Sequence, residues 1–130
     1  GGVSELVHAA VDTLTEAGCP PEVAWFECFY ELKLVVDLMF ERGIAGAFGK
    51  ISNTAEYGAY ETGPKVIGEA SRAAMREVLA EVQSGRFVER LMAEYDAGFP
   101  NLLAERARLA AHPMEGVGRE LAAIAAKGKP

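Results

Sequence analysis

Residues 20–43 read PPEVAWFECFYELKLVVDLMFERG, and this stretch decides the fold. Its two leading prolines favour a helix start, because proline lacks only an N–H group that the first turn leaves unbonded. Its final glycine favours a helix end. The apolar residues between them fall on every side of a 3.6-residue period: Val23, Trp25, Phe26, Phe29, Tyr30, Leu32, Leu34, Val35, Val36, Leu38, Met39 and Phe40. The pattern predicts a central helix with protein on all sides.

The charged residues of this predicted helix point to its chemistry. Lys33 and Asp37 are spaced i,i+4 and are expected to pair. Glu27 and Glu31 have the same spacing, which places them about 40° apart on one helical face, and neither has a basic residue three or four positions away. In apolar surroundings two such carboxylates require a proton or a cation, and Mg²⁺ prefers oxygen ligands. The spacing also fits carboxylates at a wet edge or carboxylates bonded to arginines from elsewhere.

Length and composition restrict the class of protein. With 130 residues, half of them hydrophobic, the chain is expected to form one domain over residues 1–130. The net charge of -6 argues against sequence-independent binding to nucleic acid. Cys19 and Cys28 imply no disulfide framework and fit a reducing cytoplasm, and Cys28 is interpreted as a small buried hydrophobe. No stretch predicts a signal peptide or a membrane span.

The remaining segments also read as helices, and no strand pattern or nucleotide-binding glycine motif is found. Apolar residues at helical spacing predict helices over residues 1–18, 65–83, 86–97 and 100–111, and a last helix from 114 that ends in a basic tail. The expected fold is therefore all-α, with about six to seven helices. His8 is expected at the surface or in a cap, since only His112 could join it as a ligand.

The segment ISNTAEYGAYETGPKVI, residues 51–67, carries a helix start. Ser52 followed by Glu56 resembles a capping box, with Gly58 ending a short helix and a turn at residues 63–64. Ser52 is therefore expected to be an N-cap. A hydroxyl group and backbone N–H groups gathered at a helix start also fit an anionic ligand, so this second role stays open.

Two segments carry a resemblance to a known family. FECFYELKL at residues 26–34 and SNTAEYG at residues 52–58 resemble the C-terminal helical domain of ketol-acid reductoisomerase, also called acetohydroxyacid isomeroreductase. GFPNLL at residues 98–103 and HPMEGVGREL at residues 112–121 are also close to the pattern of that family. The resemblance extends over nearly the whole chain.

The resemblance implies a Mg²⁺- and NADPH-dependent enzyme of branched-chain amino-acid synthesis, on the route to valine and isoleucine. Such an enzyme isomerises 2-acetolactate or 2-aceto-2-hydroxybutyrate by alkyl migration and reduces the product to a 2,3-dihydroxy acid. By resemblance, Glu27 and Glu31 are metal ligands and catalytic residues, Glu31 is also a candidate for proton transfer, and Ser52 contacts the substrate. The family's helical domain is knotted and forms a homodimer in which the two glutamates serve the partner's active site.

Two parts of the family pattern have no counterpart in these residues. One is the N-terminal Rossmann domain that binds NADPH, and the other is a D-x-x-x-E segment that completes the metal site. We therefore expect the chain alone to be inactive and to bind Mg²⁺ weakly. The alternatives are a non-catalytic helical dimerisation or folding module, and a ligand-free helical regulator. An apolar central helix fits burial in a dimer core and burial within one protomer equally well.

Overall fold

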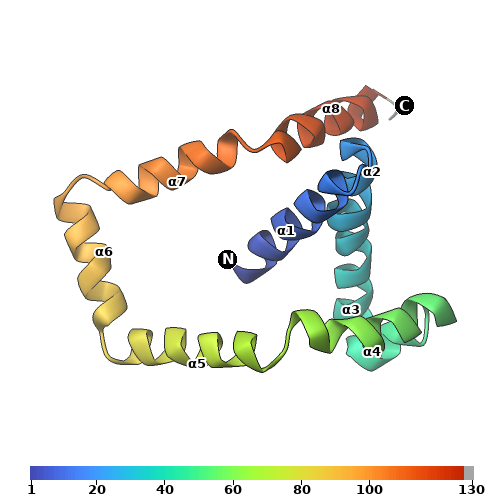
Figure 1. Ribbon diagram of the computed structural model, residues 1–130, viewed down its shortest axis with the longest axis horizontal. Helices are drawn as coiled ribbons and strands as arrows, with labels where there is room; N and C mark the ends of the chain where they lie inside the picture. Colours follow the sequence, from blue (N-terminus) through green and yellow to red (C-terminus); the bar gives the residue numbers. More distant parts are fainter. Residues whose placement is uncertain (128–130) are drawn as a thin grey trace. The chain divides into compact units, whose positions relative to one another are not determined.

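The computed structural model describes the backbone of residues 1–127 and the side chains of residues 1–124. The predicted basic tail at residues 128–130 lies outside them. Within the described residues the chain contains helices and no strand, which confirms the all-α prediction. Seven helices are present there when the continuous run from Pro21 to Phe48 is counted once (Figure 1).

The chain divides into two compact units. The first contains Gly1–Ala47 with Ala107–Pro130, and the second contains Phe48–Arg106. The predicted single domain over residues 1–130 would contain both units and stays a prediction. Each unit is described by itself.

The first unit is built where three helices meet (Figure 1). These are α1 (Gly2–Glu16), α2 (Pro21–Trp25) and α8 (Pro113–Lys127). Gly18, with φ 91°, makes the turn between α1 and α2, a conformation that glycine adopts without strain. The buried side chains of this cluster are Val7, Val11, Ala24 and Met114, each no more than 7% exposed. The interior of the first unit is therefore small and lies at one junction.

The central helix has the predicted span and two interruptions. After α2 the chain forms a π-helical turn, η1 (Phe26–Tyr30), and continues as α3 (Glu31–Phe48). The predicted break at Gly43 is confirmed, because this residue leaves helical geometry with φ 71° and ψ 167°. A second helical stretch, which the sequence did not predict, follows directly and runs to Phe48.

Of the two predicted kinds of burial for the central helix, burial within one protomer is wrong, and burial in a dimer core stays a prediction. Phe40 is 92% exposed and Val36 is 50% exposed, while Ala24 and Ala47 are the buried residues of the run. The apolar pattern therefore does not reflect burial within one protomer. The predicted pair is confirmed, since the Lys33 ammonium group donates a hydrogen bond to the Asp37 carboxylate, and this bond raises the pKa of Lys33.

The second unit is a succession of helices without a buried residue. It contains α4 (Asn53–Val66), α5 (Glu69–Gln83), α6 (Arg86–Asp96) and the first part of α7 (Pro100–Ala110). No residue between positions 48 and 106 is buried. Its exposed large apolar side chains include Met75, Val78, Leu79 and Val82 on α5 and Phe87, Val88, Leu91, Met92 and Tyr95 on α6.

Helix α4 is longer than the sequence predicted. It runs through Gly58, the expected end, and through residues 63–64, the expected turn. Pro64 is tolerated because it lies in the last turn of α4, two residues before the helix ends at Val66. There it removes one backbone hydrogen bond of the helix. Residues 65–66 therefore belong to α4, and the helix predicted from residue 65 begins at Glu69.

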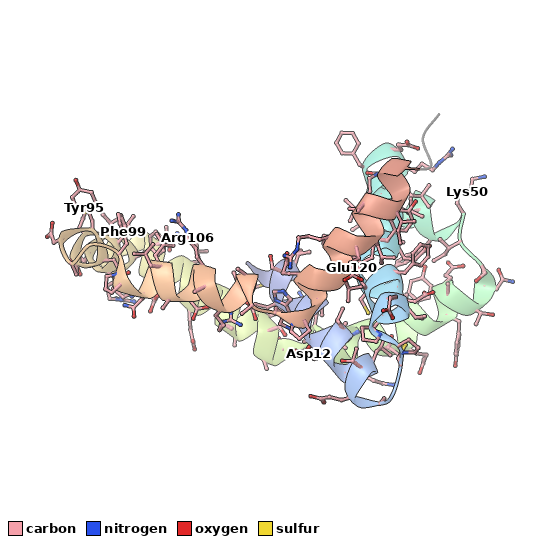
Figure 2. The ribbon with its side chains drawn as sticks, turned by 90° about the horizontal axis from the view of Figure 1, so that it is seen from above. Asp12, Lys50, Tyr95, Phe99, Arg106 and Glu120 are labelled. Carbon is pink, nitrogen blue, oxygen red and sulfur yellow. The ribbon has the colours of Figure 1, made fainter. Side chains whose placement is uncertain are left out.

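The turn between α6 and α7 is held by side chains of the second unit. The Glu94 carboxylate accepts hydrogen bonds from the backbone N–H groups of Asn101 and Leu102, both at 3.2 Å, and so caps α7. Tyr95 and Phe99 lie beside each other at this turn, with ring centroids 5.6 Å apart (Figure 2). The fold thus fixes this corner by local contacts.

Candidate functional site

The two glutamates that the sequence singles out lie on one π-helical turn of the first unit. Glu27 lies within η1, and Glu31 follows it as the first residue of α3. The backbone N–H of Glu31 donates to the carbonyl oxygen of Phe26, which closes the wider turn. Such turns occur as single insertions in α-helices and are frequent at functional sites. Sequence spacing predicted an ordinary α-helix here and gave no indication of the insertion.

The carboxylates of Glu27 and Glu31 are not buried in this chain. Glu27 is exposed and Glu31 is half-buried, so within this chain they fit the alternative of carboxylates at a wet edge. Neither carboxylate makes a hydrogen bond or an ion pair with another described residue. The alternative in which arginines of the same chain bind them is therefore excluded for the described residues. Two unpaired carboxylates on one turn fit the oxygen donors that Mg²⁺ prefers.

Aromatic side chains line the same turn. Phe26 and Tyr30 stack with ring centroids 4.7 Å apart and planes inclined by 23°. Trp25 and Phe29 meet edge to face at 5.4 Å. Phe26, Phe29 and Tyr30 all remain between 42% and 48% exposed, so the turn that carries the carboxylates also presents apolar side chains that this chain leaves uncovered.

Cys28 lies between the two glutamates in sequence and packs against the interior of the first unit. It is half-buried and forms no disulfide. Burial raises the pKa of the Cys28 thiol above its usual value of 9.0, and the neighbouring Glu27 carboxylate and Cys19 raise it further. A thiol that keeps its proton is a poor nucleophile. The interpretation of Cys28 as a small packing residue is therefore favoured over a nucleophilic role.

Ser52 lies in the second unit, at the start of α4. Its hydroxyl oxygen accepts a hydrogen bond from the backbone N–H of Ala55 at 3.2 Å, which confirms the predicted N-cap. The second hydrogen bond of a capping box, from the backbone N–H of Ser52 to the Glu56 carboxylate, is absent. The Glu56 carboxylate instead accepts a hydrogen bond from the Tyr60 hydroxyl at 2.9 Å, which raises the pKa of Tyr60. Because the exposed Ser52 hydroxyl still has its proton to donate, capping and ligand contact are compatible.

The structure brings together two histidines that the sequence left apart. The ring centroids of His8 on α1 and His112, just before α8, are 4.6 Å apart. His112 accepts the backbone N–H of Met114 on Nδ1 and lies 3.3 Å from Asp12 through Nε2. The Nδ1 atom of His8 is buried without a hydrogen-bond partner among the described residues. His112 therefore caps α8, a role that its position before Pro113 could have indicated.

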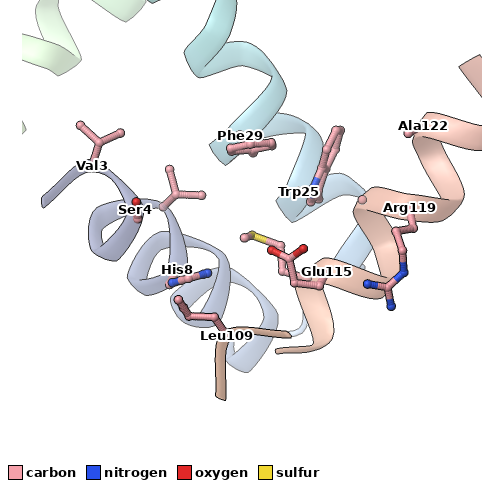
Figure 3. Close-up of a pocket in the computed structure, with 12 residues that line it drawn as sticks. Val3, Ser4, His8, Trp25, Phe29, Leu109, Glu115, Arg119 and Ala122 are labelled. Atoms are coloured by element: carbon pink, nitrogen blue, oxygen red, sulfur yellow. The ribbon is translucent and has the colours of Figure 1, made fainter. Parts of the chain in front are cut away.

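A cavity of about 590 Å³ opens beside this pair in the first unit (Figure 3). Apolar side chains from α1, the central helix and α8 form most of its wall, and its lining includes Val3, Val7, Trp25, Phe29, Leu109 and Met114. Its polar side chains are those of Ser4, His8, Glu115 and Arg119. Neither Glu27 nor Glu31 is part of the wall. Periodicity alone did not predict this cavity.

Two negative findings apply to the part of the chain that the structure describes. No three histidine, cysteine, aspartate or glutamate residues there are grouped so that they could hold a metal ion. No described helix is both long enough and apolar enough to cross a membrane. Glu27 and Glu31 are thus at most a partial ligand set among these residues.

An all-helical chain whose apolar helices have so small an interior is typical of one component of a larger assembly. Over residues 1–127 the chain matches the family model described as the C-terminal domain of ketol-acid reductoisomerase. The chain belongs to the ketol-acid reductoisomerase family.

Two relatives support this assignment. The chain is 54% identical over 130 residues to a protein of Beutenbergia cavernae named ketol-acid reductoisomerase (NADP(+)), and it covers 38% of that protein's length. The structure is similar to that of an NADH-preferring ketol-acid reductoisomerase from an uncultured archean, with a TM-score of 0.92 and 43% identity. That similarity covers 93% of this chain and 37% of the other. The predicted family and fold type are therefore confirmed, and the chain spans well under half the length of these relatives.

Proposed function

We propose that this chain is the part of a ketol-acid reductoisomerase that supplies metal ligands, a substrate contact and the dimer interface. The observation that carries the proposal is the pair of carboxylates, Glu27 and Glu31, on one π-helical turn, where no cation of the described side chains neutralises them. In the complete enzyme the reaction would be alkyl migration in 2-acetolactate or 2-aceto-2-hydroxybutyrate, followed by reduction with NADPH bound to another domain.

Glu27 and Glu31 are the residues that would hold Mg²⁺. The bound ion would supply Lewis acidity for the ketone and the tertiary alcohol of the substrate. The carboxylates would orient the substrate through the ion, and Glu31 is a candidate for moving a proton. Ser52 would donate its hydroxyl proton to an oxygen of the substrate while its oxygen accepts the N–H of Ala55.

We further propose that the functional form is a homodimer in the cytoplasm. Large apolar side chains are exposed on the central helix and on α5 and α6, including Phe40, Leu79 and Phe87. Soluble monomers rarely expose apolar patches of this extent. A second copy would cover them with an interface of the apolar kind found in obligate dimers. Two free cysteines are compatible with a reducing compartment.

The chain by itself is expected to be inactive, because two carboxylates are too few protein oxygens for a firm metal site. The second candidate function is a non-catalytic dimerisation or folding module. The uncovered apolar helices favour it for the isolated chain, since they require a partner whether or not a metal binds. The two candidates differ in whether addition of the NADPH-binding domain restores turnover of 2-acetolactate.

Calorimetric titration of Mg²⁺ into the complete reductoisomerase tests the ligand assignment. Glu27→Gln and Glu31→Gln are each expected to weaken Mg²⁺ binding at least tenfold, because each removes a charged oxygen ligand. Glu22→Gln is the matched control, since Glu22 lies on the adjoining helix α2 and is exposed. Unchanged Mg²⁺ binding in both Glu27→Gln and Glu31→Gln would exclude the proposed metal site.

A further inference from the structure

Helix α8 lies against Trp25 of the central helix at a glycine. A Cβ atom placed on Gly118 would lie 2.9 Å from Nε1 of Trp25, 3.4 Å from its Cε2 and 3.6 Å from its Cζ2. The first distance is below the van der Waals contact of these atoms, so any side chain at position 118 must displace the indole ring or α8. Figure 3 shows the Trp25 side chain beside the helix that carries Glu115 and Arg119. The indole ring of Trp25 therefore packs against the backbone of α8 at Gly118, where no side chain intervenes.

Trp25 is the last residue before the π-helical turn. It ends α2 and precedes Phe26, whose carbonyl oxygen accepts the hydrogen bond that closes η1. Its indole also meets the ring of Phe29, which lies inside the turn, edge to face at 5.4 Å. The same side chain thus contacts α8 on one side and the turn on the other.

The positions of the two carboxylates depend on the backbone of the turn. Glu27 and Glu31 make no hydrogen bond or ion pair with a described residue, so the backbone of the turn sets where their side chains begin. A π-helical turn is rare and persists only where its surroundings favour it over the α-helix. Two kinds of contact reach it from other parts of the chain: Cys28 packs against the interior of the first unit, and Trp25, which meets Phe29 of the turn, lies against Gly118 of α8.

We propose that Gly118 is a positioning residue of the metal site, which acts through Trp25 to set the register of Glu27 and Glu31. The inference rests on the proposed function, in which these two carboxylates bind Mg²⁺. Gly118 itself contacts no metal and no substrate. Its role is to let α8 approach the indole closely enough to hold the turn.

The test is Mg²⁺ binding by the complete reductoisomerase, measured by calorimetry without substrate or NADPH. Gly118→Ala is expected to weaken binding about tenfold or more, as loss of an orienting contact does at other metal sites. Gly116→Ala is the matched control: it makes the same change on the same helix, but its added methyl group meets nothing within 4 Å. Its Mg²⁺ affinity is expected to equal that of the parent protein.

A rescue and a stability control separate positioning from a general loss of structure. Trp25→Phe in the Gly118→Ala background replaces the indole with a smaller ring and is expected to restore most of the Mg²⁺ affinity. Val11→Ala weakens the same interior, where Val11 is 4% exposed, and leaves Gly118, Trp25 and the two glutamates unsubstituted. It is expected to lower the unfolding midpoint and leave Mg²⁺ affinity unchanged.

Two outcomes overturn the inference. One is a Gly118→Ala protein that binds Mg²⁺ like the parent protein, whether or not its unfolding midpoint falls. The other is a Val11→Ala protein that loses as much affinity for an equal fall in midpoint. If Glu27→Gln and Glu31→Gln weaken binding while Gly118→Ala does not, the positioning role alone fails. If the glutamate variants bind normally, the proposed function fails with it.

Discussion

Three helices of the first unit enclose Val7, Val11, Ala24 and Met114, whereas the second unit encloses no side chain at all. Both units are built from amphipathic helices joined by short turns, and both show apolar residues at helical spacing. The difference is that α1, α2 and α8 come back to one junction and α4 to α6 do not. An apolar stripe therefore indicates that a helix face is buried against other protein. It does not indicate whether that protein is the same chain or another one.

The largest expected difference between the two units is in the free energy of unfolding when a methionine side chain is truncated. Met114→Ala should lower the free energy of unfolding by about 2–5 kcal/mol, because Met114 is 7% exposed and its removal leaves a cavity. Met75→Ala on α5, where Met75 is 61% exposed, should change it by less than about 0.5 kcal/mol in the monomer. Urea unfolding at concentrations that keep the protein monomeric measures both. Equal losses would show that the second unit has an interior of its own.

A charge on the uncovered surface tests whether a second copy covers it. Leu79→Glu on α5, at a residue 55% exposed in the single chain, should raise the dimer dissociation constant at least 100-fold, roughly 3 kcal/mol, because an unpaired charge would be buried. Sedimentation velocity over a range of concentrations measures the constant.

The neighbouring residue on the same helix supplies the control for that experiment. Glu77→Gln, at an exposed position of α5, should leave the dissociation constant unchanged. If Leu79→Glu also leaves it unchanged, this face of α5 is not part of the dimer interface.

Local signals allowed much of the helix map to be predicted. The breaks at Gly18, Gly85 and Gly98 follow from glycines that take positive φ values, and the Lys33–Asp37 pair follows from spacing. The end predicted at Gly43 follows from the same property of glycine, and the helical stretch that resumes directly after it was not predicted. The ends at Gly58 and residues 63–64 are wrong, because a long helix tolerates a glycine inside it and a proline in its last turn.

The sequence predicted the residues of the candidate site but not the geometry that holds them. Glu27 and Glu31 were selected by their spacing and their lack of basic neighbours, and the structure leaves both without a partner among the described residues. The π-helical turn that carries them has no sequence signature that periodicity detects. The contact between Trp25 and Gly118 joins residues 93 positions apart in the chain. No local sequence pattern predicts such a contact.

A smaller effect is expected at one of the few side-chain contacts that fix a helix start in the second unit. Ser52→Ala removes the cap of α4 and should cost about 1 kcal/mol. The Ala55 amide, which donates to Ser52, should then exchange its hydrogen faster, as measured by hydrogen exchange with mass spectrometry. Ser52→Asp retains a capping oxygen and should restore protection. An unchanged exchange rate in Ser52→Ala would show that the cap does not stabilise α4.

The smallest effect concerns the Cys28 thiol of the first unit. Because burial and then the Glu27 carboxylate raise its pKa above 9.0, Cys28 should be alkylated by iodoacetamide slowly at pH 7, with a rate midpoint above pH 9. The folded state favours the protonated thiol, so this contribution to stability is present at lower pH and is lost as pH rises through the folded pKa. Peptide mass spectrometry resolves the rate, and a midpoint below 9 would contradict the assignment.

A Glu27→Gln variant sharpens the same measurement. Loss of the carboxylate charge removes one of the causes of the raised pKa, so the midpoint for Cys28 should move downward. A midpoint that does not move would mean that burial and Cys19 account for the raised pKa without Glu27.

The lack of an interior in residues 48–106 also has a consequence during protein synthesis. Helices of 11–15 residues, such as α6 and α5, are marginal in water without packing. In the proposed homodimer a newly made chain would keep these apolar surfaces exposed until it meets a second chain. The yield of native enzyme would then depend on encounter frequency, so that neighbouring ribosomes on one messenger, which release chains close together, would favour assembly over aggregation.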